Sequence, residues 1–280
     1  MTFKQLLDYY SDKCLELNKE ISSIKILLLD YFKIDNTQLY LKYHEHIKQE
    51  DLDSFIELAN KYLLENIPVQ YIIGYTYFYN LKIKVNKNVL IPRFETELLV
   101  EEVIKRVSLE DKIDILDIGT GSGCIALALK ANLPNTNILA IDISQEALNV
   151  AQENAKINQI DVQFLQSDIF SNIPNFQKFD IIVSNPPYIG INDEVDSIVI
   201  NNEPHLALFA KEDGLYFYQQ ILQQAPNYLK PKSMLAFEIG YNQKEALETL
   251  INKYFPNCQY EFVKDFNHID RIVFIYQDAR

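Results

Sequence analysis

From residue 113 to residue 276 the chain alternates short apolar segments with segments of helical periodicity. Seven segments rich in Ile, Val, Leu and Phe have the length of strands: 113–118, 137–141, 162–166, 179–184, 234–239, 259–263 and 271–276. Helical patterns lie between them, at 124–131, 145–157, 215–229 and 243–254, and another begins near Glu95. This alternation predicts a mostly parallel β-sheet covered by helices on both faces. Because the last connection is short, we expect the last two strands to pair antiparallel.

The N-terminal part of the chain has a different pattern. Over residues 2–67 the apolar residues recur at helical spacing, which predicts a small helical bundle. Thr2 and Gln5 match a capping box, which predicts the start of a helix. Pro68 predicts that the preceding helix has ended before it. Residues 75–91 alternate apolar with polar residues, which is typical of a β-hairpin. We therefore predict a helical bundle (1–72), a hairpin linker (73–92) and an α/β domain (93–280).

Composition disfavours several classes of protein. The formal net charge is −13 and the chain has only four arginines, whereas proteins that bind nucleic acid need clustered Lys and Arg, so no direct nucleic-acid partner is expected. The chain has neither an apolar run long enough for a membrane span nor the layout of a secretory signal. Its three cysteines are widely spaced, which suits a reducing compartment. We expect a cytoplasmic protein with no membrane partner, and a monomer.

The side chains that most often bind metals or act as bases show no typical arrangement. The histidines are His44, His46, His205 and His268. Their spacing does not match a metal site, since the first two are expected on different sides of a helix, and no metal is predicted. The glutamates near the motifs described below are Glu95, Glu97, Glu203 and Glu238. We interpret them as helix starts, ion pairs or solvated residues and assign them no chemistry.

A glycine-rich turn follows the first predicted strand. Three of the seven glycines in the chain fall within Asp117–Gly123. Glycine allows a ligand to contact the backbone, and the following helix offers free N–H groups. The spacing matches neither a P-loop nor the dinucleotide fingerprint. Asp142 closes the next strand, where a carboxylate can accept both hydroxyl groups of a ribose. We predict a nucleotide site formed by Gly119, Thr120, Gly121, Ser122, Gly123 and Asp142.

Each part of this predicted nucleotide site has a structural alternative. The glycines can serve a tight turn, and Asp142 can cap the helix that begins near Ser144. Asp168 and Ile169 follow the third predicted strand at the same edge of the sheet, where an adenine could lie against Ile169 with its amino group near Asp168. We include both residues as candidate cofactor contacts. The alternatives are a core position for Ile169 and a capping role for Asp168.

The tetrapeptide Asn185-Pro186-Pro187-Tyr188 follows the apolar segment 179–184 directly. Proline fixes φ at about −65° and has no N–H, so this loop offers hydrogen-bond acceptors. A planar amide could donate one N–H to the Asn185 side chain and another to the Pro186 carbonyl, with the Tyr188 ring against its face. We predict that all four residues form the catalytic loop and that Asn185 also contacts the cofactor. The alternative is a proline turn that closes a strand.

With these motifs the sequence closely resembles the release factor glutamine methyltransferases of the PrmC/HemK type, within the class I S-adenosylmethionine-dependent methyltransferases. The resemblance covers nearly the whole chain. Besides the glycine turn and the proline loop, it rests on residues 68–74, 89–97, 203–204 and 213–215. Two positions depart from the family pattern, because Phe94 stands where proline is usual and His268 where glycine is common.

The resemblance implies a fold, a cofactor and a substrate. The fold is a Rossmann-like, seven-stranded, mostly parallel sheet with its last strand antiparallel, plus a small N-terminal all-α domain joined by a β-hairpin. The cofactor is S-adenosylmethionine. The substrate is the glutamine of the Gly-Gly-Gln motif of peptide chain release factors, the proteins of translation termination, with the helical bundle as the part that docks them.

Two other functions stay open on the residues alone. An adenine amino methyltransferase acting on DNA or RNA would present the same two-proton donor to the proline loop. The acidic composition disfavours it. A non-catalytic module that binds S-adenosylmethionine as a sensor would keep the glycine turn but would not need the Asn185–Tyr188 loop.

Overall fold

The computed structural model describes residues 1–277, so residues 278–280 of the predicted domain 93–280 lie outside it. The chain divides into two compact units. The first contains residues 1–75 and 195–202, and the second contains residues 76–194 and the chain from Glu203 onward. The return of residues 195–202 to the first unit is not part of the sequence-based division, whose boundaries at 72 and 92 stay predictions.

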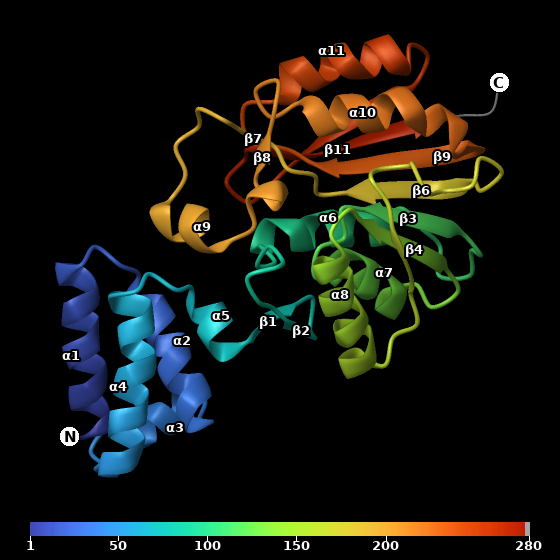
Figure 1. Ribbon diagram of the computed structural model, residues 1–280. Helices are drawn as coiled ribbons and strands as arrows, with labels where there is room; N and C mark the ends of the chain where they lie inside the picture. The colour runs from blue at the N-terminus through green and yellow to red at the C-terminus, as the bar shows by residue number, and fades with distance from the viewer. Residues whose placement is uncertain (278–280) are drawn as a thin grey trace. The chain divides into compact units, whose positions relative to one another are not determined.

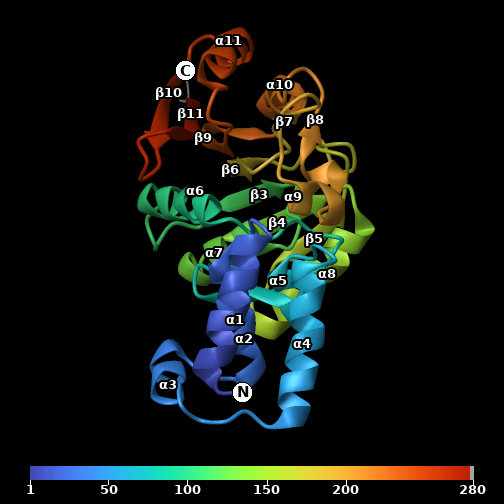
Figure 2. The same cartoon turned by 90° about the vertical axis from the view of Figure 1, so that its left-hand side faces the viewer.

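The first unit is helical, as the periodicity predicted. Its helices are α1 (Phe3–Glu16), α2 (Ile21–Phe32), α3 (Asn36–Leu41), α4 (Gln49–Leu63), α5 (Val69–Ile73) and α9 (Ser197–Asn202). Neighbouring helices α1, α2 and α4 run side by side (Figure 2). They enclose a core that includes Leu6, Tyr10 and Phe55. The capping box is confirmed, because the Gln5 amide donates to Thr2 Oγ1 (3.3 Å) and the Thr2 amide donates to Gln5 Oε1 (2.9 Å).

One prediction for this unit is wrong. His44 and His46 lie in a turn after α3 and not on a helix. The reason lies in α1, whose first N–H groups need acceptors from outside the helix. The carbonyls of residues 43 and 45 supply them, accepting from the amides of Lys4 and Phe3. If residues 43 and 45 lay inside a helix, their carbonyls would accept from the next turn of that helix and could not accept from α1.

The second unit contains a seven-stranded sheet within the described residues, in the order β10-β11-β9-β6-β3-β4-β5. Its strands are β3 (Asp114–Ile118), β4 (Asn137–Asp142), β5 (Gln163–Gln166), β6 (Phe179–Ser184), β9 (Leu229–Glu238), β10 (Gln259–Lys264) and β11 (Asp270–Gln277). Strand β11 pairs antiparallel with both β10 and β9, whereas the pairs from β9 to β5 are parallel. The predicted sheet, with its last strand antiparallel, is confirmed.

Helices cover both faces of this sheet (Figure 1). On one face lie α6 (Phe94–Lys105), α7 (Cys124–Asn132) and α8 (Gln145–Asn158), and on the other lie α10 (Tyr216–Gln224) and α11 (Lys244–Tyr254). The α10 and α11 face packs Tyr218, Ile221 and Leu247 against sheet residues such as Ile182 and Phe237. Because β3, β4, β5 and β6 are parallel, their carboxyl ends lie at one edge of the sheet.

Shorter elements complete the second unit. A two-stranded sheet of β1 (Tyr75–Phe78) and β2 (Leu81–Lys84) lies where the hairpin was predicted. Strands β7 (Ile189–Gly190) and β8 (Phe209–Ala210) pair in parallel, and 3₁₀ turns span His205–Ala207 and Ala225–Asn227. None of the helices within residues 1–277 combines the length and the apolar character that a membrane crossing needs.

The predicted helix over 215–229 is too long. Helix α10 ends at Gln224, and β9 begins at Leu229, before the predicted strand start at residue 234. Pro226 explains the difference, since proline lacks the N–H that a continuing helix would need. The chain therefore turns at residues 225–227 and enters the sheet early.

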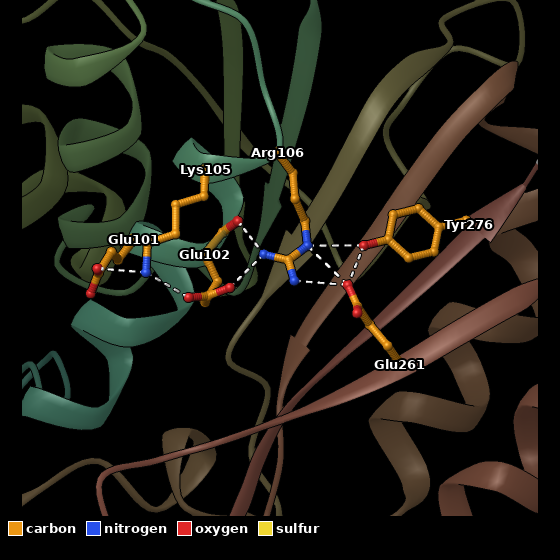
Figure 3. A network of polar contacts seen from close by, with 6 residues as sticks. All are labelled: Glu101, Glu102, Lys105, Arg106, Glu261 and Tyr276. Carbon is orange, nitrogen blue, oxygen red and sulfur yellow. Dashed lines mark hydrogen bonds and ion pairs between the residues drawn. The ribbon is translucent and has the colours of Figure 1, made fainter.

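Arg106 anchors the C-terminal end of α6 to the antiparallel side of the sheet (Figure 3). Its Nη2 donates to Glu261 Oε1 of β10 (2.7 Å), its Nε donates to the Tyr276 hydroxyl of β11 (2.9 Å), and its Nη1 donates to Glu102 Oε2 (2.5 Å). The guanidinium carbon also lies 4.0 Å from the centroid of the Phe274 ring. Because a planar guanidinium holds several partners in fixed directions, the network defines the position of α6 on the sheet.

Candidate active site

A cavity of about 190 Å³ lies at the carboxyl ends of β3, β4, β5 and β6. Of the residues predicted from the sequence, those in its lining are Gly119, Gly121, Asp142, Asp168, Ile169, Asn185, Pro186 and Pro187. Residues 88–90 and the chain around Pro204 and Leu206 also line it. The glycine turn and the proline loop therefore face one shared cavity.

The glycine turn leaves open space beside its backbone. Gly119 and Gly121 have φ of 72° and 54°, and a Cβ at either position would meet no atom within 4 Å. The amides of Gly119 and Thr120 both donate to the Ile141 carbonyl at 2.9 Å, which fixes the turn to the end of β4. A ligand of the cavity can thus approach the main chain where glycine side chains are absent.

Asp142 connects the glycine turn to the start of α8. Its Oδ2 accepts from the Gly121 amide (2.8 Å) and its Oδ1 from the Ser144 amide (2.9 Å). Burial raises the pKa of Asp142 despite these bonds. The helix cap is Ser144, whose Oγ accepts from the Ala147 amide (3.1 Å). Asp142 thus orders the loop and lines the cavity at the same time.

Three residues of the predicted nucleotide site do not line the cavity. The Thr120 hydroxyl donates to Asp117 (2.6 Å), a carboxyl whose pKa burial raises to about 7. Gly123 precedes α7 with φ of 82°, and a Cβ there would lie 3.0 Å from the Ala151 Cβ. Ser122 is buried. Gly123 thus packs the turn against α8 and Thr120 ties it to β3, and a cofactor role for the three residues stays a prediction.

Ile169 combines both interpretations that the sequence allowed. It packs against the core of the α/β unit and also lines the cavity. Its φ is 49°, a region that β-branched residues rarely adopt. Ser167 Oγ donates to its carbonyl (2.9 Å) and helps to hold this conformation. Asp168 beside it is exposed. Backbone strain of this kind concentrates at ligand sites.

The proline loop is connected to a buried chain of polar side chains. Asn185 Nδ2 donates to Thr96 Oγ1 (3.1 Å), and the Thr96 hydroxyl donates to Glu238 Oε2 (2.7 Å). The Tyr188 hydroxyl donates to Glu238 Oε1 (3.2 Å), so Tyr188 faces this chain and is not part of the cavity lining. Glu238 is only 1% exposed. Our interpretation of this glutamate as a helix start, ion pair or solvated residue is wrong.

Of the other glutamates, Glu95 lies in the first turn of α6, and the other two have structural partners. Glu203, also buried, accepts from the Ile91 amide (3.0 Å) and from Arg93 Nη2 (2.6 Å), which confirms the ion-pair interpretation. Glu97 accepts from the Tyr79 amide (2.9 Å). Through Glu203, the segment that supplies residues 88–90 to the cavity is tied to the segment that supplies Pro204. Within the described residues, no cluster of three or more His, Cys, Asp or Glu side chains could hold a metal ion.

Glu238 should make the stability of the protein depend on pH. Burial raises its pKa from 4.5 to about 7, so between these values the unfolded chain ionises while the folded protein stays protonated. The unfolding free energy is therefore expected to fall as the pH rises from 4.5 to 8, by on the order of 3 kcal/mol from this group. In E238Q this contribution is absent. Urea titrations measure the unfolding free energy of E238Q relative to that of the wild type, and this difference should be more favourable to E238Q at pH 8 than at pH 5. A difference independent of pH would contradict the expectation.

The chain matches known proteins over nearly its whole length. One family model, the PrmC N-terminal domain, matches residues 5–74, and another, the methyltransferase small domain, matches residues 94–201. A release factor glutamine methyltransferase of Streptococcus pneumoniae is 40% identical over 95% of each chain. The chain belongs to the release factor glutamine methyltransferase family. This confirms the family predicted from the sequence.

Two further likenesses agree with this family. The release factor glutamine methyltransferase of Bacillus cereus is 39% identical over 98% of this chain and 99% of the relative. Among solved structures, the hMettl16 catalytic domain has a TM-score of 0.55 with 83% of each chain covered, at 16% identity. At that identity the structural likeness supports the methyltransferase fold alone. Since relatives of the release factor glutamine methyltransferase family match both units, both are parts of the family architecture.

Proposed function

We propose that this chain transfers a methyl group from S-adenosylmethionine to the side-chain amide nitrogen of the glutamine in the Gly-Gly-Gln motif of peptide chain release factors. The observation that carries the proposal is the shared cavity, which joins an open glycine turn to a loop of hydrogen-bond acceptors. The names of the relatives supply the substrate class, because the proteins of Streptococcus pneumoniae and Bacillus cereus are release factor glutamine methyltransferases.

The residues around the glycine turn fit S-adenosylmethionine. Gly119 and Gly121 leave space for a ligand against the backbone, Asp142 places a carboxylate in the cavity, and Ile169 offers an apolar surface for a flat base. Carboxylates at the end of the second strand suit ribose hydroxyl groups. When bound, the cofactor supplies a methyl group on a positively charged sulfur. Asp142 and Asp168 are the acidic residues in the lining, and a carboxylate is complementary in charge to this donor.

The proline loop is suited to hold the acceptor amide. The glutamine side chain has two N–H groups, and the Asn185 Oδ1 and the Pro186 carbonyl can each accept one of them. This arrangement fixes the plane of the amide and aims its nitrogen into the cavity. As the nitrogen becomes bound to carbon it turns more acidic, so both hydrogen bonds strengthen on the way to the transition state. No base is required before the transfer, and the surplus proton leaves to solvent afterwards.

The remaining features of the proposal concern the whole chain. The helical unit docks the body of the release factor. The protein acts as a cytoplasmic monomer. A net charge of −13 supports a protein substrate over free nucleic acid, because phosphate groups would be repelled.

A methylation assay with four acceptors tests the proposed function. The protein is incubated with labelled S-adenosylmethionine and a purified release factor, the same factor with its tip glutamine replaced, a DNA duplex, or a structured RNA. We expect label on the unmodified release factor alone. Label on either nucleic acid would favour the adenine methyltransferase alternative, and cofactor binding without transfer to any acceptor would favour the sensor alternative.

A further inference from the structure

We propose that Thr96 and Glu238 are positioning residues, which fix the Asn185 carboxamide in the orientation that turns its oxygen toward the acceptor amide. This inference rests on the proposed function. Neither residue is part of the cavity lining, and both are buried, at 2% and 1% exposure. Their effect on the reaction must therefore pass through Asn185.

The direction of each hydrogen bond follows from the number of protons available. An ionised Glu238 can only accept, so the single proton of the Thr96 hydroxyl is committed to Glu238 Oε2 at 2.7 Å. Thr96 Oγ1 can then only accept from Asn185, which must present its Nδ2 at 3.1 Å. The remaining polar atom of the carboxamide, Oδ1, is the one left for a ligand of the cavity.

The opposite orientation of Asn185 would impair the reaction. A carboxamide turned by 180° would present N–H groups to the N–H groups of the substrate, and two donors do not bind each other. The two orientations of an isolated asparagine amide have nearly the same shape, so packing alone does not choose between them. The Thr96 hydroxyl selects one orientation. While its proton is bonded to Glu238, its oxygen can accept from Asn185 but cannot donate to it.

Rigid elements hold this chain of side chains in place. Thr96 lies in the first turn of α6, whose far end Arg106 anchors to the sheet (Figure 3). Glu238 ends β9, and its backbone carbonyl accepts from the Tyr218 hydroxyl (2.7 Å). Groups placed on helices and strands keep their geometry better than groups on loops. The Asn185 side chain is thus oriented by the sheet and by α6.

Protonation of Glu238 would remove the constraint. A protonated carboxyl can donate to Thr96, whose hydroxyl then becomes free to donate to Asn185 Oδ1. The charged and titratable groups that face Glu238 are Arg271, Glu95, Cys124, Tyr188 and Tyr218. Arg271 favours the ionised form and Glu95 opposes it. We expect the turnover number to rise with pH as Glu238 ionises, since the acceptor amide itself does not titrate in this range.

Substitutions at Thr96 separate orientation from packing. Thr96→Val keeps the shape and removes the hydroxyl, and we expect the turnover number to fall about 10- to 100-fold with little change in S-adenosylmethionine affinity. Thr96→Ser restores the hydroxyl and should restore turnover. The matched control is Thr136→Val, which removes another buried hydroxyl, one that donates to the Leu133 carbonyl (2.8 Å) away from the cavity. It should keep full turnover per folded molecule. The folded fraction of each variant is taken from its thermal melting curve.

Glu238→Gln provides the second, independent variant. Its amide can donate to Thr96, so turnover should fall and its dependence on pH should flatten. In the double variant T96V/E238Q the loss of turnover should be no greater than in T96V, because both changes break the same series of hydrogen bonds. Wild-type turnover of T96V, or losses that multiply in the double variant, would overturn the inference. If the wild type itself fails to methylate a release factor, the proposed function fails instead, and the two failures are distinguishable.

Discussion

Replacing Asn185 with alanine is expected to abolish methyl transfer while binding of S-adenosylmethionine largely survives. The side chain accepts one of the two N–H groups of the substrate amide, in a bond that strengthens toward the transition state. Loss of a single preorganised group of this kind lowers turnover by about 100- to 1000-fold. The glycine turn and Asp142 are unchanged in the variant, so the main cofactor contacts remain. Calorimetry with the cofactor and a release factor methylation assay measure the two effects separately.

Asn175→Ala is the matched control for this experiment. Asn175 is another asparagine of the same unit, and its Oδ1 accepts from the Tyr228 hydroxyl (3.1 Å) outside the cavity lining. We expect this variant to bind the cofactor and to methylate like the wild type. An Asn185→Ala protein that loses cofactor affinity and turnover to the same extent would contradict the division of roles, because Asn185 would then serve the cofactor and not the acceptor.

The parts of the fold that could be predicted are those that local sequence determines. The alternation of strand and helix patterns gave the sheet, and the Thr2–Gln5 capping box gave the start of α1, because periodicity and capping depend on residues a few positions apart. The same holds for the glycine turn and the proline loop, each of which is a continuous motif. Parallel strands then bring both motifs to one edge of the sheet.

The features that were missed depend on contacts between distant parts of the chain. Thr96 and Glu238 are 142 positions apart, and no pattern around Glu238 distinguishes a buried carboxyl from an exposed one. The short segment 195–202 joins the first unit through tertiary contacts that periodicity does not report. A departure from the family pattern carried more information, since His268, where glycine is common, has a φ of 61° that favours glycine.

Replacing Gly214 with alanine is expected to damage both stability and catalysis. Gly214 has a φ of 84°, and a Cβ there would lie 2.0 Å from the Tyr188 carbonyl oxygen and 2.5 Å from Gln243 Nε2. Gln243 Nε2 itself donates to that carbonyl (3.0 Å), so the end of the proline loop is held against this glycine. The methyl group must push the loop away. We expect the unfolding free energy to fall by about 3 kcal/mol or more, from overpacking and backbone strain together.

The effect on turnover distinguishes loop displacement from simple destabilisation. In Gly214→Ala the Asn185–Tyr188 loop shifts, so turnover per folded molecule should fall by about 100-fold at a temperature where the variant is folded. Gly74→Ala is the matched control, because Gly74 has a φ of 87° and no atom lies within 4 Å of an added Cβ. It should cost only about 1–2 kcal/mol and leave turnover unchanged. Equal losses of stability in the two variants, or full turnover in Gly214→Ala, would show that the contact with Tyr188 does not hold the loop. Gly214 is outside the cavity lining, so we expect it to act on the acceptor loop through its close approach to the Tyr188 carbonyl.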